Sequence, residues 1–354
     1  MCLLRCRTQR KGIKNVEGKE SYMVIRYRKT KGNVVLIIVA FIWRSSFVAQ
    51  KQGMEYIGPF TFNGLRSIIG AIVLTPVVTV SVRAGERMAK RSKSDSGAEK
   101  YTGAEVHSKD FNDAGNSLHE IKSKKGNKRM LIKGGLICGI VLFFASSFQQ
   151  IGLLYTTSGK SGFITAFYII IVPLLGRLIG RTVRPVLWFC AGIALIGLYL
   201  ICIKDGFSIN KGDLWTLACA FCYAIHILVI DRFSPEVNGV ALSQIQFLVA
   251  GLISIPIMFA TESADPGLLF DCWLPLCYSG IMSGGVGYTL QIIAQKHTEP
   301  TVACLIMSLE AAFALLTGWL VLGETMSAKE FIGCAVMFTA IVISQRPSRE
   351  SSFN

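Results

Sequence analysis

The chain has 354 residues, of which 51% are hydrophobic and 17% are charged, and its formal net charge is +15. Soluble globular domains carry about a quarter charged residues, so this deficit of charge and a mean hydropathy of +0.48 point away from a soluble domain. The basic residues cluster at the N-terminus and in one central segment, with few aromatic residues among them. This distribution argues against a nucleic-acid partner and is typical of segments that orient a membrane protein.

The chain opens on a basic segment, residues 1–31, in which we expect no cleavable signal peptide. Long apolar runs then alternate with polar connectors, and a helix that spans a bilayer needs about 20 apolar residues. We therefore predict an all-α polytopic membrane protein with ten transmembrane helices. The predicted spans are residues 34–50, 60–82, 131–154, 161–179, 186–203, 214–230, 240–260, 274–294, 301–322 and 328–344.

The distribution of Lys and Arg predicts the orientation of these spans. With the N-terminus inside, 29 of them lie on the inner side and 5 in the outer loops, which places both termini in the cytoplasm. The connector at residues 83–130 is rich in Lys, Ser, Gly and Asp, so we expect it to be a disordered cytoplasmic loop. The tail, residues 346–354, is expected on the same side of the cell membrane.

The two halves of the chain carry weak internal similarity at constant offsets. At an offset of 180 residues the matches are Gly32 with Gly212, Ala40–Phe41 with Ala220–Phe221, Trp43 with Tyr223, and Pro76 with Pro256. At an offset of 141 they are Gly139–Ile140 with Gly280–Ile281, and Gln150 with Gln291. We interpret residues 32–203 and 212–345 as two five-helix repeats. Because five is odd, the second repeat enters the membrane inverted, an arrangement that places binding sites near the midplane.

Close helix contacts are predicted where two glycines stand four residues apart. Such pairs let helix backbones approach one another within a membrane. They occur at Gly135–Gly139, Gly176–Gly180 and Gly280–Gly284.

Three segments carry a resemblance to a known family. The segments Phe41–Val78, Ser146–Gly176 and Ser308–Ser344 resemble the corresponding helices of EamA-type members of the drug/metabolite transporter superfamily. The resemblance implies ten helices in two inverted halves, a central cavity, and movement of small metabolites or toxic compounds by alternating access. The chain departs from the family pattern at Arg44, where a small residue, usually glycine, is expected after Trp43.

Three charged residues fall well within predicted spans, away from the span ends: Glu310, Arg66 and Arg44. A charge near the bilayer centre costs several kcal/mol, so these are candidates for coupling or charge recognition. A pair between Glu310 and an arginine would neutralise charge at the midplane, and the carboxylate would then be placed to exchange a proton. The alternative is a fixed structural pair.

Polar and aromatic residues inside the spans form a candidate substrate cavity. They are Trp43, Ser46, Gln50, Phe148, Gln149, Tyr223, His226, Tyr288 and Gln291. Aromatic walls with a few hydrogen-bonding groups suit an amphipathic organic solute. The alternative is interhelical hydrogen bonding, and for His226 it is simple packing.

The sequence favours a secondary transporter of small organic solutes, with export favoured over uptake. The Gly159–Ser161 segment lacks the glycine that a phosphate-binding loop requires, since position 154 is Leu154. We therefore expect no cofactor, metal or enzymatic activity. The expected partners are the solute and the lipid bilayer, with monomer and homodimer both open. A non-transporting sensor or scaffold and a membrane-embedded enzyme are the alternative functions.

Overall fold

The computed structural model describes residues 2–98, 109–203, 209–263, 266–313, 316 and 327–345. Over this part of the chain the structure is helical and contains no strand. The first half contains α1 (Cys2–Gly53), α2 (Pro59–Ala98), α3 (Lys109–Tyr155), α4 (Ser158–Thr165), α5 (Tyr168–Leu178) and α6 (Pro185–Cys202). The second half contains α7 (Lys211–Phe233), α8 (Gly239–Thr261), α9 (Pro266–Asp271), α10 (Trp273–Tyr278), η1 (Ser279–Tyr288), α11 (Thr289–Gln295), α12 (Pro300–Met307) and α14 (Ala328–Ser344).

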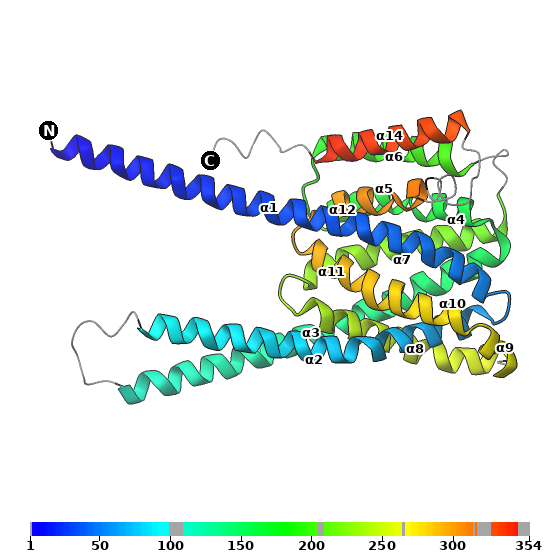
Figure 1. Ribbon diagram of the computed structural model, residues 1–354, viewed down its shortest axis with the longest axis horizontal. Helices are drawn as coiled ribbons and strands as arrows, with labels where there is room; N and C mark the ends of the chain where they lie inside the picture. Colours follow the sequence, from blue (N-terminus) through cyan, green and yellow to red (C-terminus); the bar gives the residue numbers. More distant parts are fainter. Residues whose placement is uncertain are drawn as a thin grey trace.

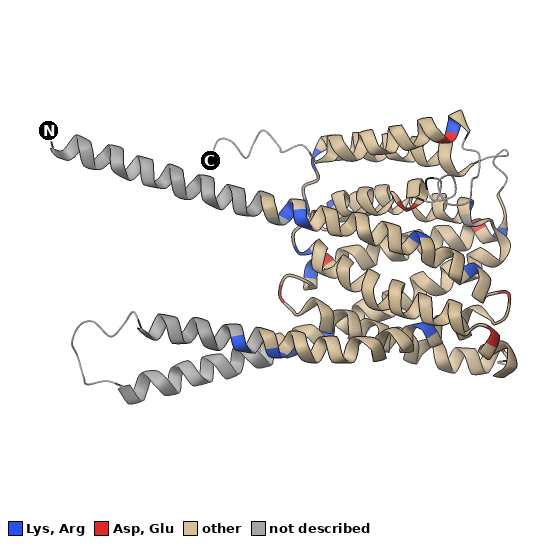
Figure 2. Cartoon of the chain, viewed as in Figure 1, with Lys and Arg blue, Asp and Glu red and all other residues tan. Residues whose placement is uncertain are grey.

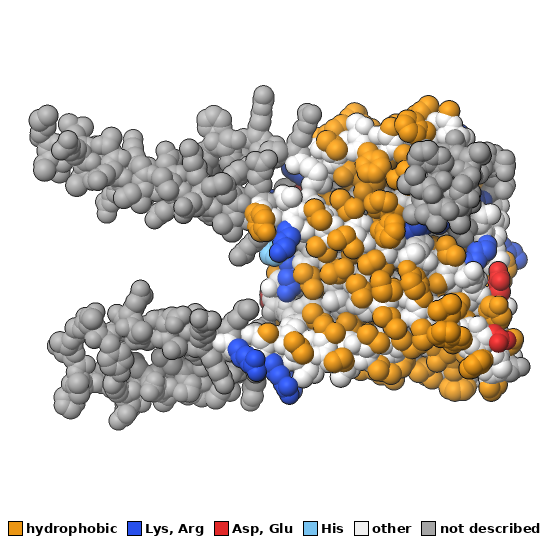
Figure 3. All heavy atoms as spheres, in the orientation of Figure 1, with side chains coloured by type: hydrophobic (Ala, Val, Ile, Leu, Met, Phe, Trp, Pro, Cys, Tyr) orange, Lys and Arg blue, Asp and Glu red, His pale blue; other side chains and the backbone are white. Residues whose placement is uncertain are grey.

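The chain is a multi-pass integral membrane protein. Seven helices in the described ranges are long and apolar enough to cross a membrane, and each overlaps one of the first seven predicted spans. Large hydrophobic side chains are exposed on the outside of the bundle, among them Phe189, Phe259 and Val342. They form a broad apolar band on the face seen in Figure 3, and most charged residues lie near the two ends of the bundle (Figure 2).

The last three predicted spans differ in detail from the helices observed. The eighth is divided into α10, the π-helix η1 and α11. The ninth contains α12, and its remaining residues lie partly outside the described ranges. The tenth is α14, with 17 residues. The arrangement of ten helices as an inverted pair of repeats therefore stays a prediction.

The connector at residues 83–130 differs from the sequence-based expectation. Helix α2 continues to Ala98 and α3 begins at Lys109, so these parts are helical rather than disordered, and residues 99–108 lie outside the described ranges. Lys, Arg, Glu and Ala are strong helix formers, so the segment has local helix propensity even though its polar composition gives it no core to bury.

Several helices begin at side-chain caps that satisfy their free backbone N–H groups. Asn210 and Asp213 form a capping box at the start of α7, and Ser327 and Glu330 form another at the start of α14. Helix α2 is capped from a distance, because the carboxylate of Glu262, at the end of α8, accepts bonds from the first N–H groups of α2 at 2.8 and 2.9 Å. This contact joins the two halves of the chain.

The core of the bundle is formed by helices from both halves. Helix α3 packs along α7 and α8, α2 packs along α8, and α6 packs along α14. Glycines permit the closest of these approaches: a Cβ atom added to Gly139 would lie 2.8 Å from the carbonyl oxygen of Gln246 on α8. At the predicted glycine pair Gly176 and Gly180, an added Cβ atom would meet no described residue within 4 Å, so the prediction of a close helix contact there is wrong for the described part of the chain.

The first and the last described helices, α1 and α14, have their outer ends, near Cys2 and Ser344, at the same end of the bundle. The N-terminal part of α1, the extensions of α2 and α3, and the last turn of α14 are all at the end on the left of Figure 1. We call this the basic end, because the Lys-rich and Arg-rich segments belong to it. The loops that follow α1, α3 and α6 lie at the opposite end.

Candidate solute cavity

A cavity of about 880 Å³ lies within the bundle and receives side chains from both halves of the chain. Its volume is in the range typical of small-molecule sites. Nine of the twelve residues predicted from the sequence line it: Trp43, Arg44, Gln50, Arg66, Gln149, Tyr223, Tyr288, Gln291 and Glu310.

Three predicted residues do not line the cavity. Ser46 is fully buried beside it and receives a 3.5 Å hydrogen bond from Gln50. Phe148 packs against the rings of Phe144 and Trp215. His226 is fully buried, and its Nε2 atom bonds to the side-chain oxygen of Gln246 on a neighbouring helix at 3.0 Å, whereas its Nδ1 atom has no hydrogen-bond partner among the described residues.

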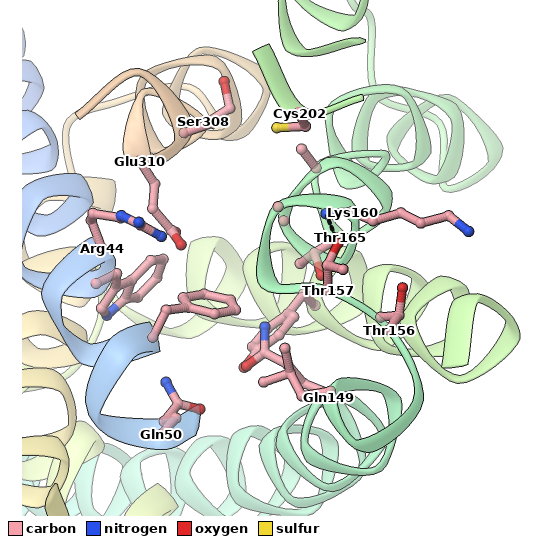
Figure 4. Close-up of a pocket in the computed structure, with 18 of the residues that line it drawn as sticks. Arg44, Gln50, Gln149, Thr156, Thr157, Lys160, Thr165, Cys202, Ser308 and Glu310 are labelled. Carbon is pink, nitrogen blue, oxygen red and sulfur yellow. Dashed lines mark hydrogen bonds between the residues drawn. The ribbon is translucent and has the colours of Figure 1, made fainter. Parts of the chain in front are cut away.

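The mouth of the cavity lies at the end of the bundle opposite the basic end. The lining residues there come from the helix ends and loops around Lys51, Thr157, Lys160, Cys202 and Asn210 (Figures 1 and 4). At this rim the Lys160 ammonium pairs with the Asp213 carboxylate at 2.5 Å.

Ion pairs join helix ends at the basic end. Arg181 pairs with Asp231, and the Arg184 guanidinium lies 3.2 Å from a carboxylate oxygen of Glu299. These contacts tie the α5–α6 connection to α7 and to the segment before α12.

Aromatic side chains form one wall of the cavity. The rings of Trp43 and Tyr288 lie 5.0 Å apart, and Phe247 meets Tyr288 edge-on at 5.3 Å. The hydroxyl of Tyr223 lies 3.1 Å from that of Tyr288 and donates to the amide oxygen of Gln149 at 3.3 Å. The wall therefore combines apolar faces with hydrogen-bonding groups.

The amide side chains connect helices around the cavity. Gln150 donates to the side-chain oxygen of Gln50 at 2.9 Å, which joins α3 to α1. Gln291 is buried, and its amide oxygen has no hydrogen-bond partner among the described residues. These glutamines therefore form a hydrogen bond between helices and also leave a buried acceptor, the amide oxygen of Gln291, available to a solute.

Arg44 and Glu310 extend toward one another inside the cavity (Figure 4). A pair between Glu310 and an arginine is one sequence-based expectation, and Arg44 is the arginine that extends toward Glu310 (Figure 4). The two are not among the ion pairs of the described residues, so this pair stays a prediction. Arg66 lies elsewhere on the cavity wall, where it bonds to Asn63. Sequence analysis missed Asn63, although its position three residues before Arg66 on one helix face was the available signal.

Two helix breaks border the cavity. The chain leaves the α-helix after Thr165 and resumes at Tyr168, and it leaves again after Met307 and resumes at Glu310. Thr165, Ala166 and Ser308 all line the cavity at these breaks. Sequence analysis missed both breaks because neither has a glycine or proline at the break itself. Broken helices that line a cavity are a recurrent feature of transporter binding sites.

A membrane-spanning helical bundle around a polar and aromatic cavity is the architecture of a membrane transporter. The profile of the EamA-like transporter family matches residues 30–91 and 210–345, just over half of the chain. The chain belongs to this family, and the resemblance inferred from the sequence is confirmed.

Individual relatives agree with this assignment. The chain is 26% identical over 315 residues to a protein of Archaeoglobus fulgidus named "Uncharacterized transporter", a match that covers 87% of this chain and 83% of the relative. It is 29% identical over 174 residues to the threonine/homoserine exporter RhtA of Escherichia coli. This match covers 48% of this chain and 58% of that exporter. A crystal structure with 17% identity superimposes with a TM-score of 0.63 and covers 89% of this chain and 96% of its own. That likeness shows the fold alone.

Proposed function

We propose that this protein is a secondary transporter that moves small organic solutes by alternating access around the central cavity. The observation that carries the proposal is a cavity of about 880 Å³, lined by both halves of the chain and bordered by two broken helices. A sensor or scaffold has no need of a charged cavity at this depth, because buried charge is costly.

The proposal includes an orientation and a direction of transport. With the basic end in the cytoplasm, as the positive-inside rule predicts, the cavity opens to the outside and the ion pairs Arg181–Asp231 and Arg184–Glu299 close the cytoplasmic end. Export then requires that these pairs separate while the solute enters. Threonine and homoserine are the first solutes to test, since one relative is named as their exporter.

The proposed coupling residue is Glu310, whose carboxylate faces Arg44 in the cavity (Figure 4). A carboxylate at this depth is placed to exchange a proton when the opening of the cavity switches from one side of the membrane to the other. Arg44 then takes part by stabilising the ionised form.

The test measures efflux from cells that express the protein or its Glu310→Gln variant. Cells are loaded with threonine, homoserine and a panel of toxic compounds, and the loss of each solute is followed over time. We expect the wild type to accelerate loss of at least one solute and Glu310→Gln to reduce that rate about tenfold or more. The matched control is Glu236→Gln, which removes an exposed carboxylate at the surface and should leave efflux unchanged. If expression alters neither efflux nor resistance for any compound, the chain is a non-transporting member of its family.

A further inference from the structure

Arg66 is a buried cation that faces the cavity. Its side chain lies on α2, is 8% exposed and lines the cavity wall. None of the ion pairs within the described ranges includes it. Its ring neighbour is Phe62, with the guanidinium carbon 5.9 Å from the ring centre. The protein therefore holds a positive charge at this point with no carboxylate of its own among the described residues.

The hydrogen bonds of Arg66 leave one edge of its guanidinium unused. The Nε and Nη2 atoms both donate to the Asn63 side-chain oxygen, at 3.3 and 3.1 Å. A guanidinium carries five N–H groups, so among the described residues two are engaged and three have no partner, including both on Nη1. The edge formed by Nη1 and Nη2 can bind a carboxylate through two parallel bonds.

Asn63 fixes the direction in which that edge points. Its side chain is fully buried, and its amide nitrogen donates to Ser147 on α3 at 3.2 Å and to Ser254 on α8 at 3.3 Å. These two bonds leave the amide oxygen for Arg66. Asn63 is therefore a positioning residue, because it acts on a solute only through the guanidinium that it orients.

The charges around the cavity show which cation lacks a partner. Four basic side chains and one acidic side chain line it. Lys160 is paired with Asp213, Arg44 faces Glu310 (Figure 4), and Lys51 is exposed at the mouth. Arg66 alone combines burial with the absence of an acidic partner in the described part of the chain. A buried charge without a counter-ion is strongly unfavourable, so an anion that enters the cavity is stabilised there.

We propose that Arg66 binds a carboxylate group of the transported solute, and that this protein therefore selects small organic solutes that carry a carboxylate. The inference rests on the proposed function of the cavity as the solute site. It assigns the aromatic wall of Trp43, Tyr223 and Tyr288 to the carbon part of the solute. Neutral or cationic compounds without a carboxylate leave Arg66 unpaired and are excluded.

The experiment compares solutes that differ only in this group. Threonine and homoserine are each paired with their carboxamides, which keep the size and lose the negative charge. Binding is measured as the thermal shift of the purified full-length protein in detergent, and transport is measured as uptake into proteoliposomes. A hydrogen bond to a charged group contributes about 1.5–3 kcal/mol, so we expect each carboxylate to bind at least about tenfold more tightly than its carboxamide.

Four variants separate recognition from structure. Arg66→Gln should remove the preference for the carboxylate, and Arg66→Lys should keep only part of it because a lysine lacks the planar fork. Asn63→Asp supplies an internal carboxylate partner to Arg66, so solute carboxylates should bind more weakly while the unliganded protein becomes more stable. Lys133→Gln, which removes an exposed basic residue, should behave as the wild type.

The outcomes distinguish this inference from the proposed function. If solutes are transported but carboxamides bind as well as carboxylates, or if Arg66→Gln keeps the preference, the inference is wrong and the transporter function stands. If carboxylates bind with the expected dependence on Arg66 but no solute crosses the membrane, the proposed function fails and the binding role of Arg66 stands. If Arg66→Gln does not fold, the test rests on the Asn63→Asp variant and on the comparison of each carboxylate with its carboxamide in the wild-type protein. The inference is wrong if the wild-type protein binds none of the carboxylates.

Discussion

At the scale of single residues, the rotation of each helix about its axis decides which side chains face the cavity. Gln149 lines the cavity whereas Phe148, its neighbour in the chain, packs on other rings, and only the packing of α3 decides between them. The partner of His226 is Gln246 on the next helix, which helix periodicity within one segment does not reveal. The charged candidates were easier to identify, because charge within an apolar run is visible in the sequence itself.

Because Arg44 extends toward Glu310 in the cavity (Figure 4), we expect a measurable coupling between the two charges. Arg44→Gln or Glu310→Gln alone leaves one charge in the cavity without its counter-ion, whereas the double variant removes both. We expect the double variant to lose less stability than the sum of the losses in the two single variants. The difference, which is the coupling energy, should be about 1 kcal/mol.

The coupling is read from the thermal unfolding of the four proteins in detergent. The exposed pair Arg232–Glu236, with side chains 59% and 47% exposed, is the control and should give about 0–0.5 kcal/mol. Additive effects at Arg44 and Glu310 would mean that the two side chains do not interact.

At the scale of helices, the apolar runs predict most elements well because a spanning helix must be long and continuously apolar. The apolar runs do not reveal the helix breaks at Ala166 and Ser308, because every residue around these breaks is compatible with a helix. They lie 142 positions apart, close to the offset of 141 at which the two halves align. The glycine pairs were a partial guide: Gly139 and Gly280 meet neighbouring helices, whereas Gly176 does not.

Gly139 tests the close packing of α3 on α8. A methyl group at this position would lie 2.6 Å from Val249 and 2.8 Å from a backbone oxygen, so Gly139→Ala should separate the helices and cost about 1–3 kcal/mol. Gly192→Ala on α6 is the matched control, because an added methyl there meets nothing within 4 Å and alanine favours the helix. Apparent unfolding temperatures in detergent should fall for the first variant and hold or rise for the second. A similar change in both would refute the close contact.

At the scale of the whole molecule, family membership and the multi-pass helical architecture were accessible from sequence because both depend on patterns that extend over long segments. The helical extensions of α2 and α3 beyond the bundle were not predicted from the sequence. Their composition is typical of disorder, but their local helix propensity is high. The open and closed ends of the cavity were also not accessible, because each depends on contacts between residues far apart in the chain, such as Arg184 with Glu299. The inverted relation of the two halves stays a prediction.

The proposed direction of transport requires a cavity that opens on the side of the membrane opposite the basic end of the bundle. Cys202 is a free cysteine at the mouth of that cavity, and its modification by a membrane-impermeant thiol reagent can be read by mass spectrometry in intact cells and in inverted vesicles, with Cys202→Ala as the control. We predict that Cys202 is modified faster in intact cells than in inverted vesicles, and that solute efflux falls once Cys202 is modified. Modification only from the cytoplasmic side, or full efflux after modification, would show that the cavity does not open to the outside.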